Sequence, residues 1–554
     1  MNGTLLTGAT VWTGPDCQPR PGWLLVSGET IEAAGTTAQP PPAAGRVLDL
    51  QGKHVLPGFV DAHQHPTLTA WLPQGTDGIG WPDLPTALAA IRTAAVANAS
   101  SPWLVFWNAL PHTWPQRRLP TTGELDRVAP GRRVLVSVRD LHRAAVSPVV
   151  LAELGLDAAS SWRRSDVVRD RRGRPTGELW EHACGAAVAL ALAQTEQHLG
   201  AQQVEAALRA ELDRRLGYGY THVHDAYVPP QQHQRMARLA EGVAPRLSWA
   251  IGSRAGIFAP GAGRAEFPAG RYGAASGEAK LFLDGGERCA LRLPLAALGG
   301  LVLGAFREST AVRGCGPLRE AAGRRVHVGG EGLTLRYLRY DDRALVDVLA
   351  GYAQAGLRVR LHAVGNLAVR QAAKALRTAG VSAGTATVDH LALLDPATAD
   401  ALAASGAWAC YQPGFLSSFG RTLLAASIDR HAAVFGGRLL RDAGLRLVLS
   451  SDHPGGVLDP LQILRLAVSR RLADGTVIQP EQGISCPDAV RGLTTEAAAS
   501  LDAPGAGGLA PGQPADLVVC DGDPFQPGTV VTQTWIGGRV AWSAEGCLGG
   551  QVEL

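Results

Sequence analysis

The sequence predicts an α/β protein whose largest part is a (β/α)8 TIM barrel. Apolar strand patterns alternate with helical patterns through the middle of the chain, which is typical of βα units around a parallel sheet. Polar residues of metal-ligand type stand near the ends of several of these strands, where such a barrel carries its chemistry. The eight strands that we expect in the barrel are 55–65, 220–226, 246–252, 279–284, 358–364, 385–391, 408–412 and 446–452.

The two ends of the chain predict a second, smaller domain. Both contain short strand patterns separated by turn residues, which indicate a small β-sandwich domain built from both termini. A long helix-bearing insertion after barrel strand 1 and a second excursion at about 286–340 predict lids, because loops this long are more often functional than spacers. The boundaries that we expect are 1–55 and 504–554 for the small domain, 56–77 for the first barrel strand, 78–205 for the insertion and 206–503 for the remaining barrel.

The bulk properties of the chain are consistent with a soluble enzyme. The 554-residue chain has a formal net charge of +3 and eight cysteines without a C-x-x-C spacing. This charge is too small to indicate nucleic-acid or membrane binding, and the cysteine pattern argues against a disulfide framework or a thiolate metal site. No apolar run is long enough to span a bilayer, and no secretory signal is visible. We therefore expect a cytoplasmic protein, and a homodimer stays open.

Lys280 is unusual because only three of the 52 basic residues are lysine and all others are arginine. It stands in the apolar run AKLFL (279–283), which predicts a buried strand, and burial of an unpaired ammonium is costly. Lysine, unlike arginine, can lose its proton and react through its amine. A lysine carbamylated by CO₂ would be an anionic ligand able to bridge two metal ions. An ion-paired lysine at a strand end is the alternative, and this residue alone does not decide between them.

The motif His63-Gln64-His65 ends an apolar strand that contains Pro57-Gly58. Side chains alternate between the faces of a strand, so the two histidines point the same way. Neutral imidazoles are the commonest protein ligands of metals, and two on one face suit one divalent ion. An isolated H-x-H is weak evidence, but this one stands where a barrel places its active site.

Three further strands end in a ligand-type residue, namely His362, His390 and Asp452. Any one of these histidines is more often a packing residue than a ligand. The ordered set of an H-x-H, a strand lysine, two strand histidines and a strand aspartate is much harder to explain by packing alone. Nitrogen and oxygen ligands without thiolate suit Zn²⁺, with Mn²⁺, Fe²⁺ or Co²⁺ as alternatives.

These motifs together resemble those of the amidohydrolase superfamily, in particular the amidohydrolase 3 branch that includes N-substituted formamide deformylases. The resemblance spans essentially the whole chain. It departs from the branch after Gly285, where Gly286-Glu287-Arg288-Cys289 replaces a run of small and hydroxyl residues, and at His453, where many relatives have tryptophan. The segments that carry the resemblance are LPGFVDAHQH (56–65), KLFLDG (280–285), LHAVG (361–365), DH (389–390), SDHP (451–454) and GLAPGQPADLVV (508–519).

The resemblance implies a metal-dependent hydrolase that cleaves a C–N bond with a metal-activated hydroxide. In such a site His63 and His65 would hold the more buried of two divalent ions, and His362 and His390 the more exposed one. Carbamylated Lys280 would bridge the ions. Asp452 would complete the buried site and act as general acid and base. A site with one ion, held by His63, His65 and Asp452, stays open.

Other residues are weaker candidates for contact with substrate or for orienting a ligand. His142 lies in a segment of the insertion that resembles one reaching toward substrate in relatives. Tryptophans of the insertion (Trp103, Trp107, Trp114 and Trp180) could form an apolar wall, although buried aromatics are usually core. The complete set of candidate substrate-binding residues is His142, His224, Asp284, Gln412 and His453.

Two other functions are compatible with the same scaffold. A metal-dependent decarboxylase or lyase could use the same ligands, since the ligands alone do not fix the bond that is broken. A metal-free binding protein is less favoured, because all six ligand positions hold suitable residues. The sequence does not identify the substrate.

Overall fold

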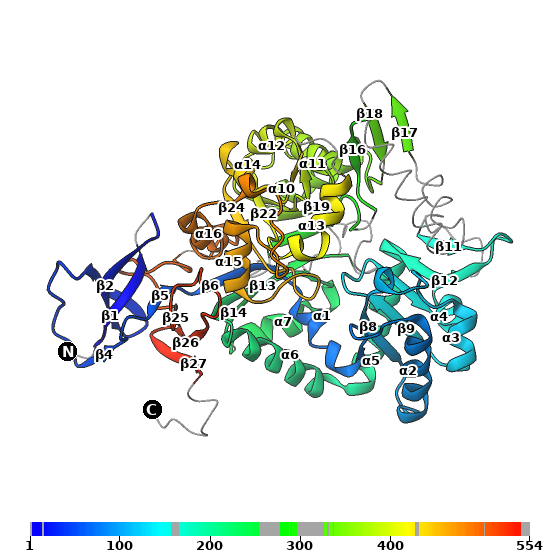
Figure 1. The fold of residues 1–554 in the computed structure, drawn as a ribbon, viewed down its shortest axis with the longest axis horizontal. Helices are drawn as coiled ribbons and strands as arrows, with labels where there is room; N and C mark the ends of the chain where they lie inside the picture. The colour runs from blue at the N-terminus through cyan, green and yellow to red at the C-terminus, as the bar shows by residue number, and fades with distance from the viewer. Residues whose placement is uncertain are drawn as a thin grey trace.

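The computed structural model describes residues 3–13, 16–156, 166–242, 244–253, 277–286, 288–295, 326–329, 332–335, 337–426, 432–503 and 505–544. Glu287 and most of the predicted second excursion lie outside the described residues. Three parts of the fold are visible in Figure 1: a small sheet from both ends of the chain in blue and red, a central barrel, and the insertion in blue to cyan.

The central sheet confirms the (β/α)8 barrel. Its strands are all parallel and follow the order β24-β22-β20-β19-β15-β14-β13-β6. Between β24 and β6, the N–H of Asp452 donates to the carbonyl of His63 (2.8 Å), and the N–H of Ser451 donates to the Asp61 carboxylate (3.1 Å). The strands are β6 (Phe59–Gln64), β13 (Tyr220–Val228), β14 (Arg246–Ile251), β15 (Glu278–Phe282), β19 (Arg358–Ala363), β20 (Ala386–His390), β22 (Trp408–Tyr411) and β24 (Leu447–Leu449).

Helices alternate with these strands and pack around the barrel. The helix α10 shows why these segments are helical: the Asp341 side chain caps the N–H of Ala344, and Leu345, Leu349 and Tyr352 form one buried face. The barrel helices are α1 (Pro66–Thr69), α6 (Ala201–Leu216), α7 (His233–Ala240), α10 (Asp342–Gln354), α11 (Asn366–Thr378), α12 (Pro396–Ala403), α13 (Phe415–Ala426), α14 (Gly437–Asp442), α15 (Pro460–Ser469), α16 (Cys486–Gly492) and α17 (Thr495–Ser500).

The predicted first barrel strand, 55–65, is wrong in one respect, because it is two strands. The segment β5 (His54–Pro57) belongs to the small sheet, where it pairs with β1 and β25. The chain then changes sheets at Gly58 and enters the barrel as β6. A Cβ at Gly58 would lie 2.3 Å from Oγ1 of Thr221 on β13, so glycine permits the close approach of the two strands.

Strands from both ends of the chain form one mixed sheet around an apolar core that includes Leu24, Val55 and Leu517. The described strands belong to a single sheet, so the predicted two-sheet sandwich is not confirmed, and the predicted domain boundaries stay predictions. The strands are β1 (Gly3–Thr13), β2 (Gln18–Ser27), β3 (Thr30–Thr36), β4 (Arg46–Asp49), β5, β25 (Leu517–Cys520), β26 (Val531–Ile536) and β27 (Arg539–Ser543).

The insertion contains a six-stranded sheet that the sequence analysis missed. Helices cover both of its faces, and each face has its own apolar core. Trp103 and Trp114 are buried in these two cores, so they do not form the suggested substrate wall. The strands are β7 (Thr76–Asp77), β8 (Leu104–Ala109), β9 (Val134–Val138), β10 (Arg143–Val146), β11 (Val167–Arg169) and β12 (Pro175–Trp180), and the helices are α2 (Leu84–Ala97), α3 (Thr122–Val128), α4 (Pro148–Glu153) and α5 (Glu181–Leu199).

The remaining strands are short. Three of them, β16 (Leu291–Leu293), β17 (Val326–Gly329) and β18 (Gly332–Leu335), form an antiparallel sheet within the predicted second excursion. Two more, β21 (Leu393–Leu394) and β23 (Ala433–Val434), pair with each other. Among the described helices, none has both the length and the apolar character that a membrane span requires.

The close contact at Gly58 predicts the effect of a substitution. Gly58→Ala would place a methyl group against Thr221, and we expect it to lower the free energy of unfolding by about 1–3 kcal/mol, the usual cost of overpacking. Gly123→Ala is the control, because nothing lies within 4 Å of a Cβ at that helical position. Denaturant unfolding measures both variants. Equal stabilities for the two would contradict the close approach of β6 and β13.

Candidate metal centre

Five of the six predicted metal ligands lie at the C-terminal ends of barrel strands, and Lys280 lies within β15, joined to His63 through a shared contact with Asp389. The ring centroids of His63 and His65 are 5.4 Å apart, those of His63 and His390 5.1 Å, and those of His362 and His390 4.3 Å. His63, His362 and His390 stand at or next to the last residue of their strands, and His65 and Asp452 follow strands β6 and β24. The structure therefore assembles residues that are up to about 390 positions apart in the sequence.

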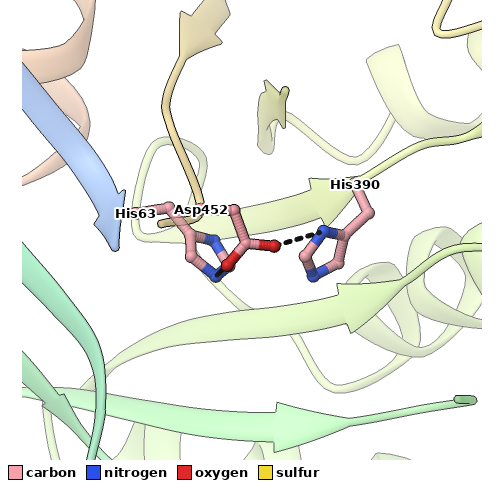
Figure 2. A group of neighbouring side chains, drawn as sticks. All are labelled: His63, His390 and Asp452. Atoms are coloured by element: carbon pink, nitrogen blue, oxygen red, sulfur yellow. Dashed lines mark ion pairs between the residues drawn. The ribbon is translucent and has the colours of Figure 1, made fainter. Parts of the chain in front are cut away.

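The carboxylate of Asp452 lies between imidazoles, as Figure 2 shows. Its Oδ1 is 3.1 Å from Nε2 of His65 and 3.4 Å from Nε2 of His63, and its Oδ2 is 3.6 Å from Nδ1 of His390. Burial would raise the pKa of Asp452, but the neighbouring histidines outweigh burial and hold this pKa well below its usual value. Asp452 is therefore a carboxylate at neutral pH.

His63 is fully buried and neutral. Burial lowers its pKa to about 3, although the nearby Asp389 works in the opposite direction. Its Nδ1 lies 3.0 Å from Oδ1 of Asp389, within hydrogen-bonding distance. A proton on Nδ1 directed at this carboxylate leaves the lone pair of Nε2 on the side of Asp452, which is the tautomer that a metal ligand requires.

His362 and His390 are also neutral imidazoles. Burial lowers the pKa of His390 to about 4 and that of His362 well below its usual value. The Nδ1 of His390 is 3.1 Å from the side-chain oxygen of Gln412, whose amide donates to Ser450 (3.0 Å). Gln412 thus orients a histidine of the centre.

His65 differs from the other histidines because it has two carboxylate neighbours. Its Nε2 contacts Asp452, and its Nδ1 is 3.7 Å from Asp225. Burial alone would lower the pKa of His65, but its contacts with these two carboxylates raise it to about 9. A proton on His65 then supplies the positive charge that the two carboxylates require in the metal-free protein.

Lys280 is buried on β15 and forms an ion pair. Its Nζ donates to Oδ2 of Asp389 (2.6 Å), while Nη1 of Arg360 donates to Oδ1 of the same carboxylate (2.8 Å). The unmodified lysine is therefore ion-paired, which is the alternative that the sequence left open. A carbamate at Lys280 stays a prediction.

Several of these residues fit a divalent metal ion. The ligand atoms of His63, His390 and Asp452 all lie within 4.8 Å of one another. Two neutral imidazoles and a carboxylate are a suitable donor set for Zn²⁺ and related ions. A second group, His63 with Asp389 and Cys410, is equally compact. It fits less well, because Lys280 and Arg360 already neutralise Asp389, and burial raises the pKa of the Cys410 thiol.

His142 reaches this centre from the insertion. Its ring centroid is 5.7 Å from that of His362, and its Nδ1 is 2.8 Å from Oε2 of Glu181. Two glycines after β15 make room for this pair, because a Cβ at Gly285 would lie 2.2 Å from the Glu181 carboxyl group and a Cβ at Gly286 would lie 2.4 Å from the His142 ring. The insertion therefore contributes to the wall of the centre.

The other weaker candidates have different positions. Asp284 accepts hydrogen bonds from the N–H groups of Ala290, Val364 and Gly365, each at 2.9 Å, so it joins the ends of β15 and β19. Burial raises its pKa to about 7.

His224 lies below the centre and contacts Glu278 and Ser248, each at 2.9 Å, rather than any of the six proposed ligands. The backbone carbonyl of His453 accepts from the N–H of His65 (3.0 Å), which places His453 beside the centre.

Three important residues were missed. Asp389, Arg360 and Glu181 are buried charged residues whose partners are distant in the sequence. The only available signal was the occurrence of charged residues within apolar strand patterns, as for Arg360 and Asp389. For Glu181, which begins a helix, the sequence carried no signal.

Comparisons with known proteins agree with this geometry. A profile of the amidohydrolase family matches residues 46–541. An N-substituted formamide deformylase of Arthrobacter pascens is 26% identical over 550 residues, which cover 94% of this chain and 95% of that protein. A putative amidohydrolase of Bacillus subtilis is 24% identical over 496 residues, with 86% of each chain covered.

Two solved structures share the fold. Both are described as uncharacterized metal-dependent hydrolases. The one from Pyrococcus horikoshii is 19% identical, with a TM-score of 0.66 and coverage of 95% of this chain and 98% of that chain. The one from Pyrococcus furiosus is 18% identical, with a TM-score of 0.62 and coverage of 95% and 100%.

The charge of His65 predicts how the stability of the metal-free protein depends on pH. Its folded pKa of about 9 exceeds its ordinary value of 6.5, so protonated His65 stabilises the fold fully below pH 6.5, and this contribution is lost as the pH rises through 9. Between pH 6.5 and 9, metal-free wild type should lose up to about 3 kcal/mol more unfolding free energy than His65→Asn. Denaturant unfolding with a chelator present measures this difference, and equal losses in the two proteins would contradict it.

Proposed function

Because the chain belongs to the amidohydrolase family and is thus a metal-dependent hydrolase, we propose that it cleaves a carbon–nitrogen bond of a small molecule. The bond is of the amide, formamide or carbamate type. The observation that carries the proposal is the convergence of neutral imidazoles on the ionised carboxylate of Asp452. The relative described as a formamide deformylase, similar over nearly its whole length, supports this choice of bond.

The residues that would hold metal are His63, His65, His362, His390, Lys280 and Asp452. One or two divalent ions fit this set, and zinc is the ion that its donors favour. When bound to these residues, a divalent ion would supply polarisation of the scissile carbonyl and would make a water molecule more acidic. When metal binds, the proton that His65 carries in the metal-free protein has to leave, because a ligating imidazole is neutral.

The charges around Lys280 support its carbamylation together with metal binding. Lys280 and Arg360 carry two positive charges, and Asp389 and Glu278 carry two negative charges, so this buried group of four residues is neutral. Conversion of the Lys280 ammonium to a carbamate would change its net charge to −2. A divalent cation would restore neutrality, which buried charges require. The ammonium form therefore suits the metal-free protein, and the carbamate form suits the metal-bound one.

Asp452 is the proposed general base and acid. Its low pKa means that it is ionised and can accept the proton of the attacking water. It then delivers that proton to the nitrogen of the leaving amine as the carbon–nitrogen bond breaks, so one residue transfers the proton between water and product. His142, held by Glu181, stands beside His362 and would contact the substrate from the insertion. His453, next to Asp452, is a further proposed substrate contact.

A substrate screen tests the proposed reaction. The metal-loaded protein is offered panels of N-formyl, N-acyl, carbamate and cyclic amide compounds, and release of amine is measured. At least one class should be hydrolysed by wild type and not by His63→Ala, which removes a proposed ligand while leaving the barrel core unchanged. Full activity of His63→Ala at matched metal content, or the absence of bound divalent metal in the active wild type, would refute the metal centre.

Asp452→Asn tests the proton transfer. The amide keeps the size of the side chain but cannot accept the proton, so turnover should fall by roughly 10²–10⁴-fold, the usual contribution of a positioned acid–base group. Metal content is measured in parallel, because only a variant that retains metal separates the two roles of Asp452. A turnover near that of wild type would exclude Asp452 as the base.

Lys280→Arg tests the carbamate. Arginine can keep the ion pair with Asp389 but cannot form a carbamate, so the variant should fold and lose activity. Lys374→Arg is the control, because Lys374 is exposed and paired only with Asp342 among the residues described.

In Lys280→Ala, acetate or propionate should restore part of the metal binding. Carbon-13-labelled bicarbonate should give a carbamate signal in metal-loaded wild type, and its absence from a protein with two bound ions would refute the bridge.

A further inference from the structure

A layer of charged side chains fills the barrel interior directly below the candidate metal centre. Glu278, Lys280, Arg360 and Asp389 are each at most 4% exposed. Barrel interiors are usually filled by branched apolar side chains, and buried charges are costly unless they are paired. The ion pairs among these four buried side chains therefore need an explanation.

The contacts form a continuous chain that begins at His63. Its Nδ1 is 3.0 Å from Oδ1 of Asp389, and the same oxygen accepts a hydrogen bond from Nη1 of Arg360 (2.8 Å). The Nε of Arg360 donates to Oε2 of Glu278 (3.2 Å). One guanidinium thus joins two carboxylates, which its planar fork of donors permits and a lysine ammonium would not reproduce.

The lower end of the chain is held by histidine and serine. Oε2 of Glu278 is 2.9 Å from Nε2 of His224, whose Nδ1 is 2.9 Å from Oγ of Ser248. The Ser248 hydroxyl is also 2.9 Å from Nε2 of His222. Side chains from three other strands, β13, β14 and β15, therefore hold the lower side of Arg360 on β19.

We propose that Arg360 and Glu278 are positioning residues for His63 and act on it through Asp389, and that His224 supports Glu278 instead of binding substrate. The inference rests on the proposed function, because it takes His63 as a metal ligand. Arg360 holds one oxygen of Asp389 facing Nδ1 of His63, while in the metal-free protein the other oxygen is bound by Lys280. That arrangement fixes the tautomer and the ring orientation of His63, and residues that orient metal ligands in this way typically contribute 10–100-fold to metal affinity.

The experiment measures divalent metal affinity by competition with a chelator. Arg360→Met should lower the affinity 10–100-fold relative to wild type. The double variant Glu278→Gln/Arg360→Met removes one positive and one negative charge, so it should regain thermal stability lost by Arg360→Met, because no buried charge is left unpaired. Its metal affinity should nevertheless stay low, since the contact that orients Asp389 is still absent.

The double variant distinguishes a positioning role of Arg360 from simple charge pairing. It also provides the test if Arg360→Met does not fold. Metal affinity that recovers with stability would overturn the proposal, as would a folded Arg360→Met with wild-type affinity. Thr387→Val is the matched control, because Thr387 is fully buried on β20 beside this layer but outside the chain of contacts, and it should keep wild-type affinity. An equal loss in Thr387→Val would also overturn the proposal. Absence of metal binding by wild type would instead refute the proposed function.

Discussion

The centre depends on the contacts of the Asp389 carboxylate. This carboxylate joins three buried side chains from three other strands, namely an ammonium group, a guanidinium group and an imidazole. Lys280 comes from β15, Arg360 from β19 and His63 from β6, which is three strands away from β20 around the closed barrel. Arg360 and Lys280 hold the pKa of Asp389 well below its usual value against the opposing effect of burial. Because the Asp389 carboxylate contacts three partners at once, its orientation is restricted. It therefore also restricts the positions of those three side chains.

The sequence predicted the barrel, and it indicated six candidate ligands because five of them stand at the end of a strand with a strong apolar pattern and Lys280 lies within one. His63, His65, His362, His390 and Asp452 required only that parallel strands bring their C-terminal ends together. The partners of these residues could not be predicted in the same way. Asp389 precedes a proposed ligand, and its direction into the barrel, toward Lys280 and Arg360, depends on the register between neighbouring strands.

The insertion shows a different limit of sequence reasoning. Its strands are short and several are separated by helices, so their patterns did not show that they form one sheet, and the helices alone were expected. The sequence also did not predict the contact of the insertion with the barrel, although the pair Gly285-Gly286 is a signal of this contact. Those glycines stand where a side chain would collide with Glu181 or His142. Absence of side chains at a strand end can thus mark the place where another part of the chain approaches.

The contrast between His63 and His65 follows from the number of carboxylates that each one meets and from what else those carboxylates bind. Asp389, beside His63, is already neutralised by Lys280 and Arg360, so burial dominates and His63 stays neutral. Asp225 and Asp452, on either side of His65, have no lysine or arginine partner among the ion pairs of the described residues, and a proton on His65 supplies the missing charge. The same deficit of positive charge would attract a divalent cation. The acidic residues of the centre thus favour a cation. In the metal-free protein, Lys280 and Arg360 beneath the centre keep His63 neutral, the form that a metal ligand requires.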